Sequence, residues 1–285
     1  MTEIGAVGLV LHPRRDCAQV IGTVVNWARS RDIKLFGVAA EMSRAGNAVV
    51  AVEPDQLANS VDLLVSLGGD GTMLRAMRLA IEDRTPVLGV NLGKLGFLAE
   101  IDPPELDDAL CAIDDHHYTT EPRSGLRALT ADKKAIAFND IALVRVPGNG
   151  MAAVQLHVEG HPFVRYSADA VVVATPTGST AYSFSAGGPI VSPHAEGLLV
   201  TPVAPHSTFN RAVFLSSGEK LALEITGGWL GVEADGLLIG HVGAGTVIDI
   251  EVLPAAARVV RLGRTTFYQR AQRKFGLTGF TSPGA

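Results

Sequence analysis

Blocks of hydrophobic and polar positions alternate along the first part of the chain. A continuous apolar run at residues 6–11 is typical of a buried parallel strand, and the largely apolar segments at residues 61–67 and 86–90 predict two further strands. Residues 16–29 and 73–81 instead carry apolar side chains at helical spacing. This order of strands and helices predicts a parallel sheet covered by helices, and ligands of such sheets bind at the carboxyl ends of the strands.

The pattern changes from about residue 125 onward. Short apolar segments follow one another as far as residue 252, and Glu-Gly, Gly-Gly and Asp-Gly pairs separate them. This density of short strands predicts an all-β second domain built as a sandwich of sheets, with one short helix near Ser179. We place the domain boundary near residue 122, after a connecting helix at residues 105–113.

The composition narrows the class of protein. The 285 residues are 47% hydrophobic, which is enough for two buried cores. A net charge of −5 argues against a sequence-independent nucleic-acid binder, although glycine-loop N–H groups and a metal ion can still hold the phosphates of a nucleotide. No apolar run approaches the roughly 20 residues of a membrane span, so we expect a cytoplasmic protein that binds neither nucleic acid nor a membrane. Cys17 and Cys111 are too isolated for a disulfide framework or a zinc site, and we expect both to be buried.

The sharpest local motif is Gly-Gly-Asp-Gly-Thr at residues 68–72, between a predicted strand and a predicted helix. Its glycines allow positive φ and close approach of the backbone, so consecutive N–H groups can face a phosphate, and Thr72 could cap the helix. A carboxylate at Asp70 would repel phosphates unless it serves as a general base or as a partner of Mg²⁺. The alternative interpretation is a plain Asp-Gly turn. The motif is not a Walker loop, because Gly-x-x-x-x-Gly-Lys-Ser/Thr does not occur.

A second motif, Ala-Thr-Pro-Thr-Gly-Ser-Thr-Ala-Tyr at residues 174–182, also follows a predicted buried strand. It gathers hydroxyl groups, a turn-forming glycine and a phenol, and Tyr182 could stack on or hydrogen-bond a base or a ribose. An elaborate helix cap is the alternative interpretation. Downstream, the Gly-Gly-Pro sequence at residues 187–189 is typical of a loop that lets backbones approach closely.

Several other positions are weaker candidates on their own. Asn139 and Asp140 interrupt an apolar run, and such a pair is either a bulge or a ligand contact. Asp169 precedes an apolar strand, where solvation is an equally good explanation. The Asp-Gly pair at residues 235–236 is most simply a hairpin turn, and His206 is most simply a loop histidine.

In their order along the chain, these segments resemble the NAD kinase family. The matching pieces are residues 68–72, 89–98, 139–140, 169, 175–182, 185–189, 204–207, 210–211, 235–236 and 273–276. They span nearly the whole chain. The glycine motif alone is shared with diacylglycerol and sphingosine kinases and echoed in phosphofructokinases, whereas the Thr-Pro-Thr-Gly-Ser-Thr-Ala-Tyr segment is far more specific.

The resemblance implies a fold and a set of site residues. It implies an N-terminal Rossmann-like parallel α/β domain at residues 1–122 and a C-terminal β-sandwich domain at residues 123–285, with NAD in the cleft between them and a C-terminal tail that could pack back on the first domain. Asp70 would be the catalytic general base, and the phosphate loop would consist of Gly68, Gly69, Gly71 and Thr72. The implied NAD-binding residues are Asp70, Gly71, Arg75, Asn139, Asp140, Asp169, Thr180, Ala181, Tyr182, Ser185 and His206.

The same resemblance implies a reaction, which is phosphorylation of the 2′-hydroxyl of the adenosine ribose of NAD to give NADP. The donor would be ATP or polyphosphate, and Mg²⁺ or another divalent metal would be held by the phosphates, with no side chain assigned to it. The chain would form a homodimer or homotetramer in which a neighbouring subunit completes each NAD site. Two alternatives stay open, which are a lipid or sugar kinase that shares the glycine loop and a NAD-binding sensor that has lost phosphoryl transfer.

Two departures from the family pattern bear on these expectations. The family commonly has Asp-Gly where this chain has Asp169 and Ala170, and alanine would be unfavourable if that backbone needs positive φ. The family pair is often Asn-Glu, whereas this chain has Asn139 and Asp140, whose carboxylate reaches less far.

Overall fold

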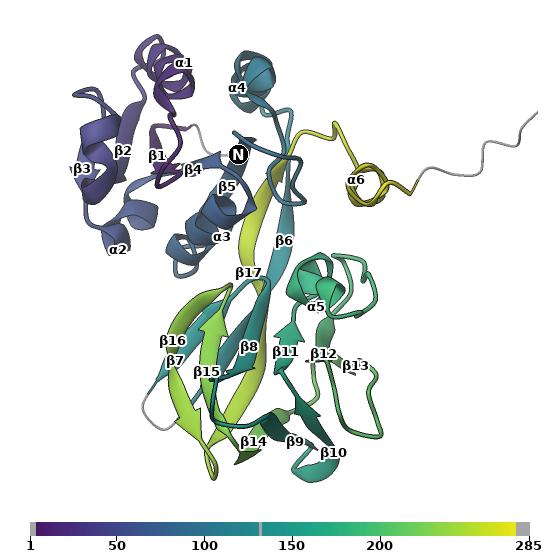
Figure 1. Ribbon diagram of the computed structural model, residues 1–285. Coiled ribbons are helices and arrows are strands. Elements are labelled where there is room, and N and C mark those ends of the chain that lie inside the picture. The colour runs from purple at the N-terminus through teal and green to yellow at the C-terminus, as the bar shows by residue number, and fades with distance from the viewer. Residues whose placement is uncertain (1–3, 131–132, 278–285) are drawn as a thin grey trace, which may run out of the picture. The chain divides into compact units, whose positions relative to one another are not determined.

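The computed structural model describes residues 4–130 and 133–277 (Figure 1). The chain divides into two compact units, which are described separately. Unit 1 runs as far as Pro122 and takes in the segment that begins at Ala257, and unit 2 spans Arg123–Ala256. The fold class predicted from the sequence is confirmed, because unit 1 is a parallel α/β structure and unit 2 an antiparallel β-sandwich.

Unit 1 alternates strands and helices. Two long strands, β6 (Thr119–Leu129) and β17 (Val247–Arg261), begin in one unit and end in the other. The other strands of unit 1 are β1 (Ala6–Leu11), β2 (Lys34–Val38), β3 (Val50–Val52), β4 (Leu63–Gly68) and β5 (Pro86–Asn91). The helices are α1 (Ala18–Arg29), η1 (Ala39–Arg44), α2 (Pro54–Leu57), η2 (Ala58–Ser60), α3 (Asp70–Leu79), η3 (Pro103–Glu105), α4 (Leu106–Asp114) and α6 (Phe267–Phe275).

The sheet of unit 1 places its parallel strands in the order β17, β5, β4, β1, β2, β3. Helices α1 and α4 pack on one face, and α2 and α3 lie on the other (Figure 1). Because both faces are covered, β1, β4 and β5 are buried along nearly their whole length, which explains their largely apolar sequences. The chain runs from β1 outward to β3 and then returns to β4 on the other side of β1. The carboxyl ends of β1 and β4 therefore flank a topological switch point.

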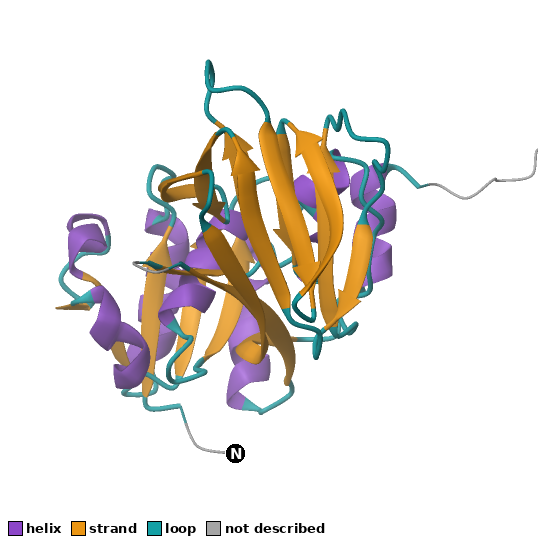
Figure 2. Cartoon of the chain, turned by 90° about the horizontal axis from the view of Figure 1, so that it is seen from below, coloured by secondary structure: helices purple, strands orange, loops and turns teal. Residues whose placement is uncertain are grey.

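Unit 2 consists mostly of antiparallel strands (Figure 2). Its first sheet has the order β13 (Val213–Ser216), β12 (Gly197–Val203), β11 (Ala170–Ala174), β8 (Asp140–Arg145), β15 (Trp229–Ala234) and β16 (Leu237–Gly243). In the second sheet β10 (His161–Ala168), β9 (Ala152–Val158), β14 (Leu221–Gly227) and β17 lie side by side, and β7 (Lys134–Ala137) pairs with β6, which pairs with β17. Alternate residues of β8 and β11, including Leu143 and Val173, join Leu156 and Leu223 of the second sheet in one core.

Two short helical segments follow β11, namely η4 (Thr177–Thr180) and α5 (Tyr182–Ser185). They confirm the prediction of a short helix near Ser179. The outer face of the first sheet carries Ala142, Val172 and Ala174, and the Tyr182 side chain packs against this cluster. Residues of the second motif are thereby seated on the face of the sheet that points away from the sandwich core.

Some predictions were less accurate. The helix predicted at residues 16–29 begins at Ala18, and the helix predicted at residues 73–81 begins earlier, at Asp70. Cys17 is buried as expected, but Cys111 is exposed, because it lies on the polar face of α4. Within the described residues, no helix is both long and apolar enough to cross a membrane.

Candidate active site

The glycine motif forms the junction between β4 and α3. Gly68 ends the strand, Gly69 is the N-cap residue, and the helix begins at Asp70. Thr72 therefore lies within the first turn, and its predicted capping role is wrong. The predicted positive φ is also wrong, because none of the three glycines has a φ in the left-handed range.

Small size explains the glycine at position 68, whereas the surroundings of Gly69 and Gly71 are open. A Cβ atom at Gly68 would clash with the Thr72 side chain. At Gly69 and Gly71, no atom of the described residues outside the adjacent backbone lies within 4 Å of the place where a Cβ would stand. The loop is thus open on the side where a phosphate could approach its backbone, at the N-terminal end of a helix dipole.

The Asp70 carboxylate is held by the backbone of a distant loop. Its Oδ2 accepts a hydrogen bond from the Phe97 N–H at 2.9 Å, and its Oδ1 accepts one from the Leu98 N–H at 3.0 Å. The loop comes so close that a Cβ at Gly96 would clash with the carboxylate. Each oxygen keeps a further lone pair, so the carboxylate can still accept a proton or another hydrogen bond.

Several cations surround the carboxyl end of β1. Arg75 donates to the Leu11 carbonyl at 2.6 Å and forms an ion pair with Glu41 at 2.5 Å. Arg44 donates to the His12 carbonyl at 2.6 Å. Burial, together with the nearby Arg15 guanidinium and other arginines, lowers the pKa of His12, which marks this region as electropositive.

We call Arg14, Arg15, Arg44 and Arg75, whose charges act on His12, the β1 cation cluster. It lies beside the glycine motif, because β1 and β4 are neighbouring strands and the His12 N–H donates to the Leu67 carbonyl at 2.8 Å. Within the described part of the chain, two buried polar atoms close to it lack a hydrogen-bond partner, Thr72 Oγ1 and Arg75 Nε. Unsatisfied buried polar atoms of this kind are typical of a site that waits for a ligand or water.

In unit 2, a hairpin turn organises the start of β8. Asp235 and Gly236 both have positive φ, so the predicted hairpin turn is confirmed. The Asp235 carboxylate also accepts hydrogen bonds from the N–H groups of Phe138 at 3.1 Å, Asn139 at 2.7 Å and Asp140 at 3.3 Å. The turn therefore fixes the backbone of the Asn-Asp pair.

The second motif packs directly against this pair. Thr175 N–H donates to the Asn139 carbonyl at 2.8 Å, and Thr175 Oγ1 donates to the Phe138 carbonyl at 2.6 Å. A Cβ at Gly178 would clash with the Asn139 carbonyl oxygen, so this position needs glycine for close approach. Residues predicted from two separate motifs are thus brought together in unit 2.

Asp140 is the most strongly perturbed carboxyl group of this region. Burial, with help from the charges of Asp235 and Glu233, raises its pKa to about 7. A backbone hydrogen bond from Tyr182 acts in the opposite direction. Burial and the charges of Glu233, Asp140 and Asp169 also raise the pKa of the Tyr182 phenol. A cluster of acidic groups that faces a phenol and a hydroxyl-rich segment is suited to accept hydrogen bonds from the hydroxyls of a sugar.

The remaining predicted residues lie around this cluster. Asp169 connects β10 to β11 and forms an ion pair with Arg145 at 2.6 Å. Thr180 ends η4 and Ala181 connects η4 to α5, and both are half-buried. Ser185 ends α5 and has an exposed side chain. His206 is exposed on a loop, where its N–H donates to the Ser167 carbonyl at 2.7 Å.

Ala170 does not create the strain that its departure from the family pattern would cause at positive φ. It is the first residue of β11 and pairs with Val144 and Val203 in extended antiparallel strands. Alanine is therefore compatible with the backbone here, and Asp169 keeps its place at the strand end.

Sequence reasoning missed several residues of both regions. Arg145 and Glu233 had no motif around them, and Asp235 was interpreted only as part of a turn. In unit 1, the support of Asp70 by Phe97 and Leu98 joins residues about 27 positions apart along the chain. Either aspartate or asparagine suits the first position of such a turn, so the choice of aspartate was the available indication that the side chain of Asp235 has a further role.

Comparison of the chain with known protein families identifies the family to which it belongs. The ATP-NAD kinase N-terminal domain matches residues 7–118, and the ATP-NAD kinase C-terminal domain matches residues 138–261. The chain belongs to the NAD kinase family. The match to both domains sets aside a lipid or sugar kinase, which would share the glycine loop alone.

Individual NAD kinases and solved structures agree with this assignment. NAD kinase 1 of Streptomyces avermitilis is 37% identical over 313 residues, covering 95% of this chain and 87% of that protein. The NAD kinase of Desulforamulus reducens is 32% identical over 279 residues, covering 95% and 97% respectively. A crystal structure of yeast NADH kinase complexed with NADH superposes with a TM-score of 0.83 at 26% identity, covering all of this chain and 90% of that one. The chain is accordingly an NAD kinase by family, fold and close relatives.

Proposed function

We propose that this NAD kinase transfers the γ-phosphoryl group of ATP to the 2′-hydroxyl of the adenosine ribose of NAD, with Asp70 as the general base. The observation that carries the proposal is the Asp70 carboxylate, which two backbone N–H groups fix beside an open glycine loop. A base must be held within hydrogen-bond reach of the proton it removes, and a fixed carboxylate meets that need.

The chemistry is a direct in-line displacement. The 2′-oxygen forms a bond to the γ-phosphorus, the bond from that phosphorus to the β,γ-bridging oxygen breaks, and the hydroxyl proton moves to Asp70. ADP and NADP are the products. The protein contributes mainly position and electrostatic stabilisation, because phosphoryl transfer requires little covalent work from side chains.

The donor's phosphates are proposed to bind at the carboxyl ends of β1 and β4. The glycine loop offers backbone N–H groups there, and the β1 cation cluster offers guanidinium groups. ATP is the proposed donor, and inorganic polyphosphate would suit the same donor chemistry.

A divalent metal such as Mg²⁺ fits this site only with help from the phosphates. No group of three or more His, Cys, Asp or Glu side chains that could hold a metal occurs among residues 4–130 and 133–277. Mg²⁺ commonly binds through substrate phosphates plus one or two carboxylates, and Asp70 has lone pairs free for that role. When bound, the metal would neutralise charge on the phosphates.

The acceptor is proposed to bind to residues of unit 2. Asn139 and Asp140 would hold the adenosine part of NAD, with the Asp140 carboxylate on its ribose. Thr180, Ala181, Tyr182 and Ser185 would shape the pocket, and Asp169 and His206 would lie toward the nicotinamide. The packing of the second motif on the Asn-Asp pair supports this grouping.

We also propose a homodimer or homotetramer in the cytoplasm. The edge strand β16 exposes Leu237 and Leu238 to more than half of their surface, and Trp229 is exposed beside it on β15. Exposed apolar side chains on an unpaired edge favour self-association. Light scattering at micromolar concentration distinguishes an oligomer from a monomer of 29.8 kDa, which would contradict this part.

A coupled assay of NADP formation from NAD, ATP and Mg²⁺ tests the main proposal. Asp70→Asn should lower kcat by roughly 10²–10⁴ while NAD binding survives, because the amide cannot take up the proton. Unchanged turnover in the variant would exclude Asp70 as the base. An inactive wild type that still binds NAD tightly, with ATP or polyphosphate as donor, would favour a NAD sensor.

A further inference from the structure

Helix α6 holds the loop that orients Asp70. The two N–H groups that bind the Asp70 carboxylate belong to Phe97 and Leu98, so the position of the carboxylate depends on this loop. The carbonyl oxygens of the same loop point toward guanidinium groups from the other end of the chain. Arg270 of α6 donates to the Ala99 carbonyl at 2.5 Å and contacts the Phe97 carbonyl at 3.4 Å.

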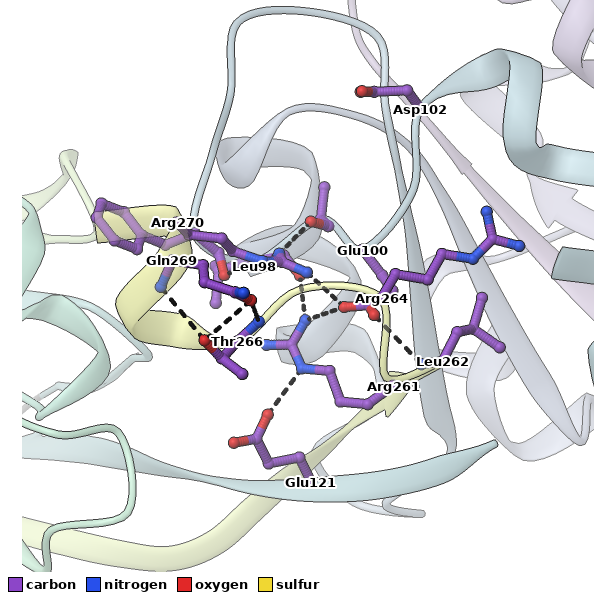
Figure 3. A network of polar contacts seen from close by, with 12 residues as sticks. Leu98, Glu100, Asp102, Glu121, Arg261, Leu262, Arg264, Thr266, Gln269 and Arg270 are labelled. Carbon is purple, nitrogen blue, oxygen red and sulfur yellow. Dashed lines mark hydrogen bonds and ion pairs between the residues drawn. The ribbon is translucent and has the colours of Figure 1, made fainter. Parts of the chain in front are cut away.

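The buried carboxylate of Glu100 holds both guanidinium groups in place. The Glu100 side chain is fully buried and accepts hydrogen bonds from Arg270 at 2.5 Å and from Arg261 at 2.9 Å (Figure 3). Arg261 also donates to the Leu98 carbonyl at 3.1 Å and pairs with Glu121 at 2.7 Å. Two arginines and one glutamate thus fix three consecutive carbonyl groups of the loop.

The loop also contacts α6 through its aromatic side chain. The Phe97 ring packs against Phe267 at 5.6 Å and against Phe275 at 5.5 Å between ring centroids. The Lys274 ammonium lies 4.7 Å from the centre of the Phe97 ring. The side chain of Phe97 therefore anchors to α6, while its N–H binds Asp70.

Stability alone does not explain buried charges in this network. Removing ions from water is unfavourable, and well-packed apolar residues often stabilise a fold as well as a buried ion pair does. What the charges add is a fixed geometry, because a planar guanidinium donates in defined directions. The nearby Asp70 charge also acts on Arg270 electrostatically, so the two groups are close enough to interact.

We propose that Arg270 of α6, together with Arg261 and Glu100, positions Asp70 for catalysis by fixing the Phe97–Leu98 N–H donors. The inference rests on the proposed role of Asp70 as base. Arg270 is a positioning residue, since it contacts the loop and not the reacting atoms. The C-terminal helix is then a part of the catalytic apparatus, although it lies about 170 residues from the loop along the chain.

Arg270→Lys keeps the charge but loses the fork of donors. It should lower kcat by roughly ten- to a hundredfold with little change in KM for NAD or ATP, because misplacement of a catalytic group affects the transition state more than ground-state binding. Arg273→Met is the matched control, because Arg273 lies on the same helix with an exposed side chain, and its kinetics should equal those of wild type. Thermal melts confirm that each variant is folded.

A double-mutant cycle separates positioning from general damage. In the Asp70→Asn background, Arg270→Lys should cause little further loss, because the group that it positions is already disabled. An equal loss in both backgrounds, or a rise in KM without a fall in kcat, would overturn the proposal. If Arg270→Lys fails to fold, Phe97→Leu tests the same loop by the same cycle. Full turnover in Asp70→Asn alone would instead overturn the proposed function.

Discussion

At the scale of single residues, Asp140 combines deep burial with two neighbouring carboxylates. Its pKa of about 7 means that the folded protein keeps this proton up to neutral pH, whereas an aspartate in the unfolded chain loses it near pH 3.9. The titration of Asp140 therefore lowers the free energy of unfolding as the pH rises from about 4 to about 7. A ligand-binding role offers a reason to retain such a destabilising group.

Replacement of Asp140 should show how much its buried carboxylate destabilises the fold. Asp140→Asn removes the titration, so its unfolding temperature should exceed that of wild type by several degrees at pH 8, and the difference should shrink toward pH 4.5. NAD binding should weaken by about tenfold or more at pH 8, because charged acceptors form strong hydrogen bonds. Calorimetry at the two pH values and a titration with NAD measure both effects. Asp249→Asn is the exposed control, and a pH-independent difference for Asp140→Asn would contradict the burial argument.

At the scale of elements, two glycines with opposite surroundings allow a matched test. Gly22 lies within α1 and has open space where a Cβ would stand, whereas a Cβ at Gly178 in η4 would clash with the Asn139 carbonyl oxygen. Gly22→Ala should stabilise the protein by about 0.5–1 kcal/mol through helix propensity. Gly178→Ala should destabilise it by about 1–3 kcal/mol and weaken NAD binding. Urea denaturation compares the two, and a stabilising Gly178→Ala would contradict the described packing.

The burial of each strand and helix explains whether its sequence predicts it. Strands β1, β4 and β5 are covered on both faces, so their largely apolar sequences were sufficient evidence for them. Strands β2 and β3 were not predicted, because the short apolar runs at residues 35–40 and 49–52 do not by themselves distinguish a strand from part of a helix. Helix α6 was missed because its buried face includes Arg270, where a helical pattern would have an apolar residue.

The sequence likewise predicts some parts of the candidate site and not others. The Gly-Gly-Asp-Gly-Thr and Thr-Pro-Thr-Gly-Ser-Thr-Ala-Tyr motifs are contiguous, and their chemistry can be interpreted from neighbouring residues. The partners that fix Asp70 are dispersed, because Phe97, Glu100 and Arg270 meet only in the folded chain. Local sequence therefore indicates the proposed base, Asp70, and tertiary structure determines how its carboxylate is held.

At the scale of the whole molecule, charge is distributed unevenly. The chain carries a net charge of −5, yet the β1 cation cluster concentrates four arginines beside the glycine loop. An anionic donor should therefore be attracted locally, and salt should screen that attraction. The KM for ATP should rise between 50 and 200 mM NaCl, by more than the KM for NAD.

Arg14 provides the variant for this test. Its side chain is exposed beside the loop, and Arg14→Gln should raise the KM for ATP by about two- to fivefold and flatten the dependence on salt. Arg165→Gln on β10 is the control, because it removes the same charge from unit 2. Equal effects of the two substitutions would show that only net charge matters, and the cluster would lose its proposed role.

Unit 1 is built from two separate segments of the chain. The first segment ends at Pro122, and the second begins at Ala257 within β17, which pairs with β5. During synthesis on the ribosome, residues 123–256 are complete before unit 1 has its last strand and α6. Unit 1 therefore cannot complete its fold before the whole of unit 2 has been synthesised, although N-terminal domains usually fold first. If α6 also positions the catalytic loop, a nascent chain cannot phosphorylate NAD until α6 has emerged, so activity depends on a segment that is made only after the whole of unit 2.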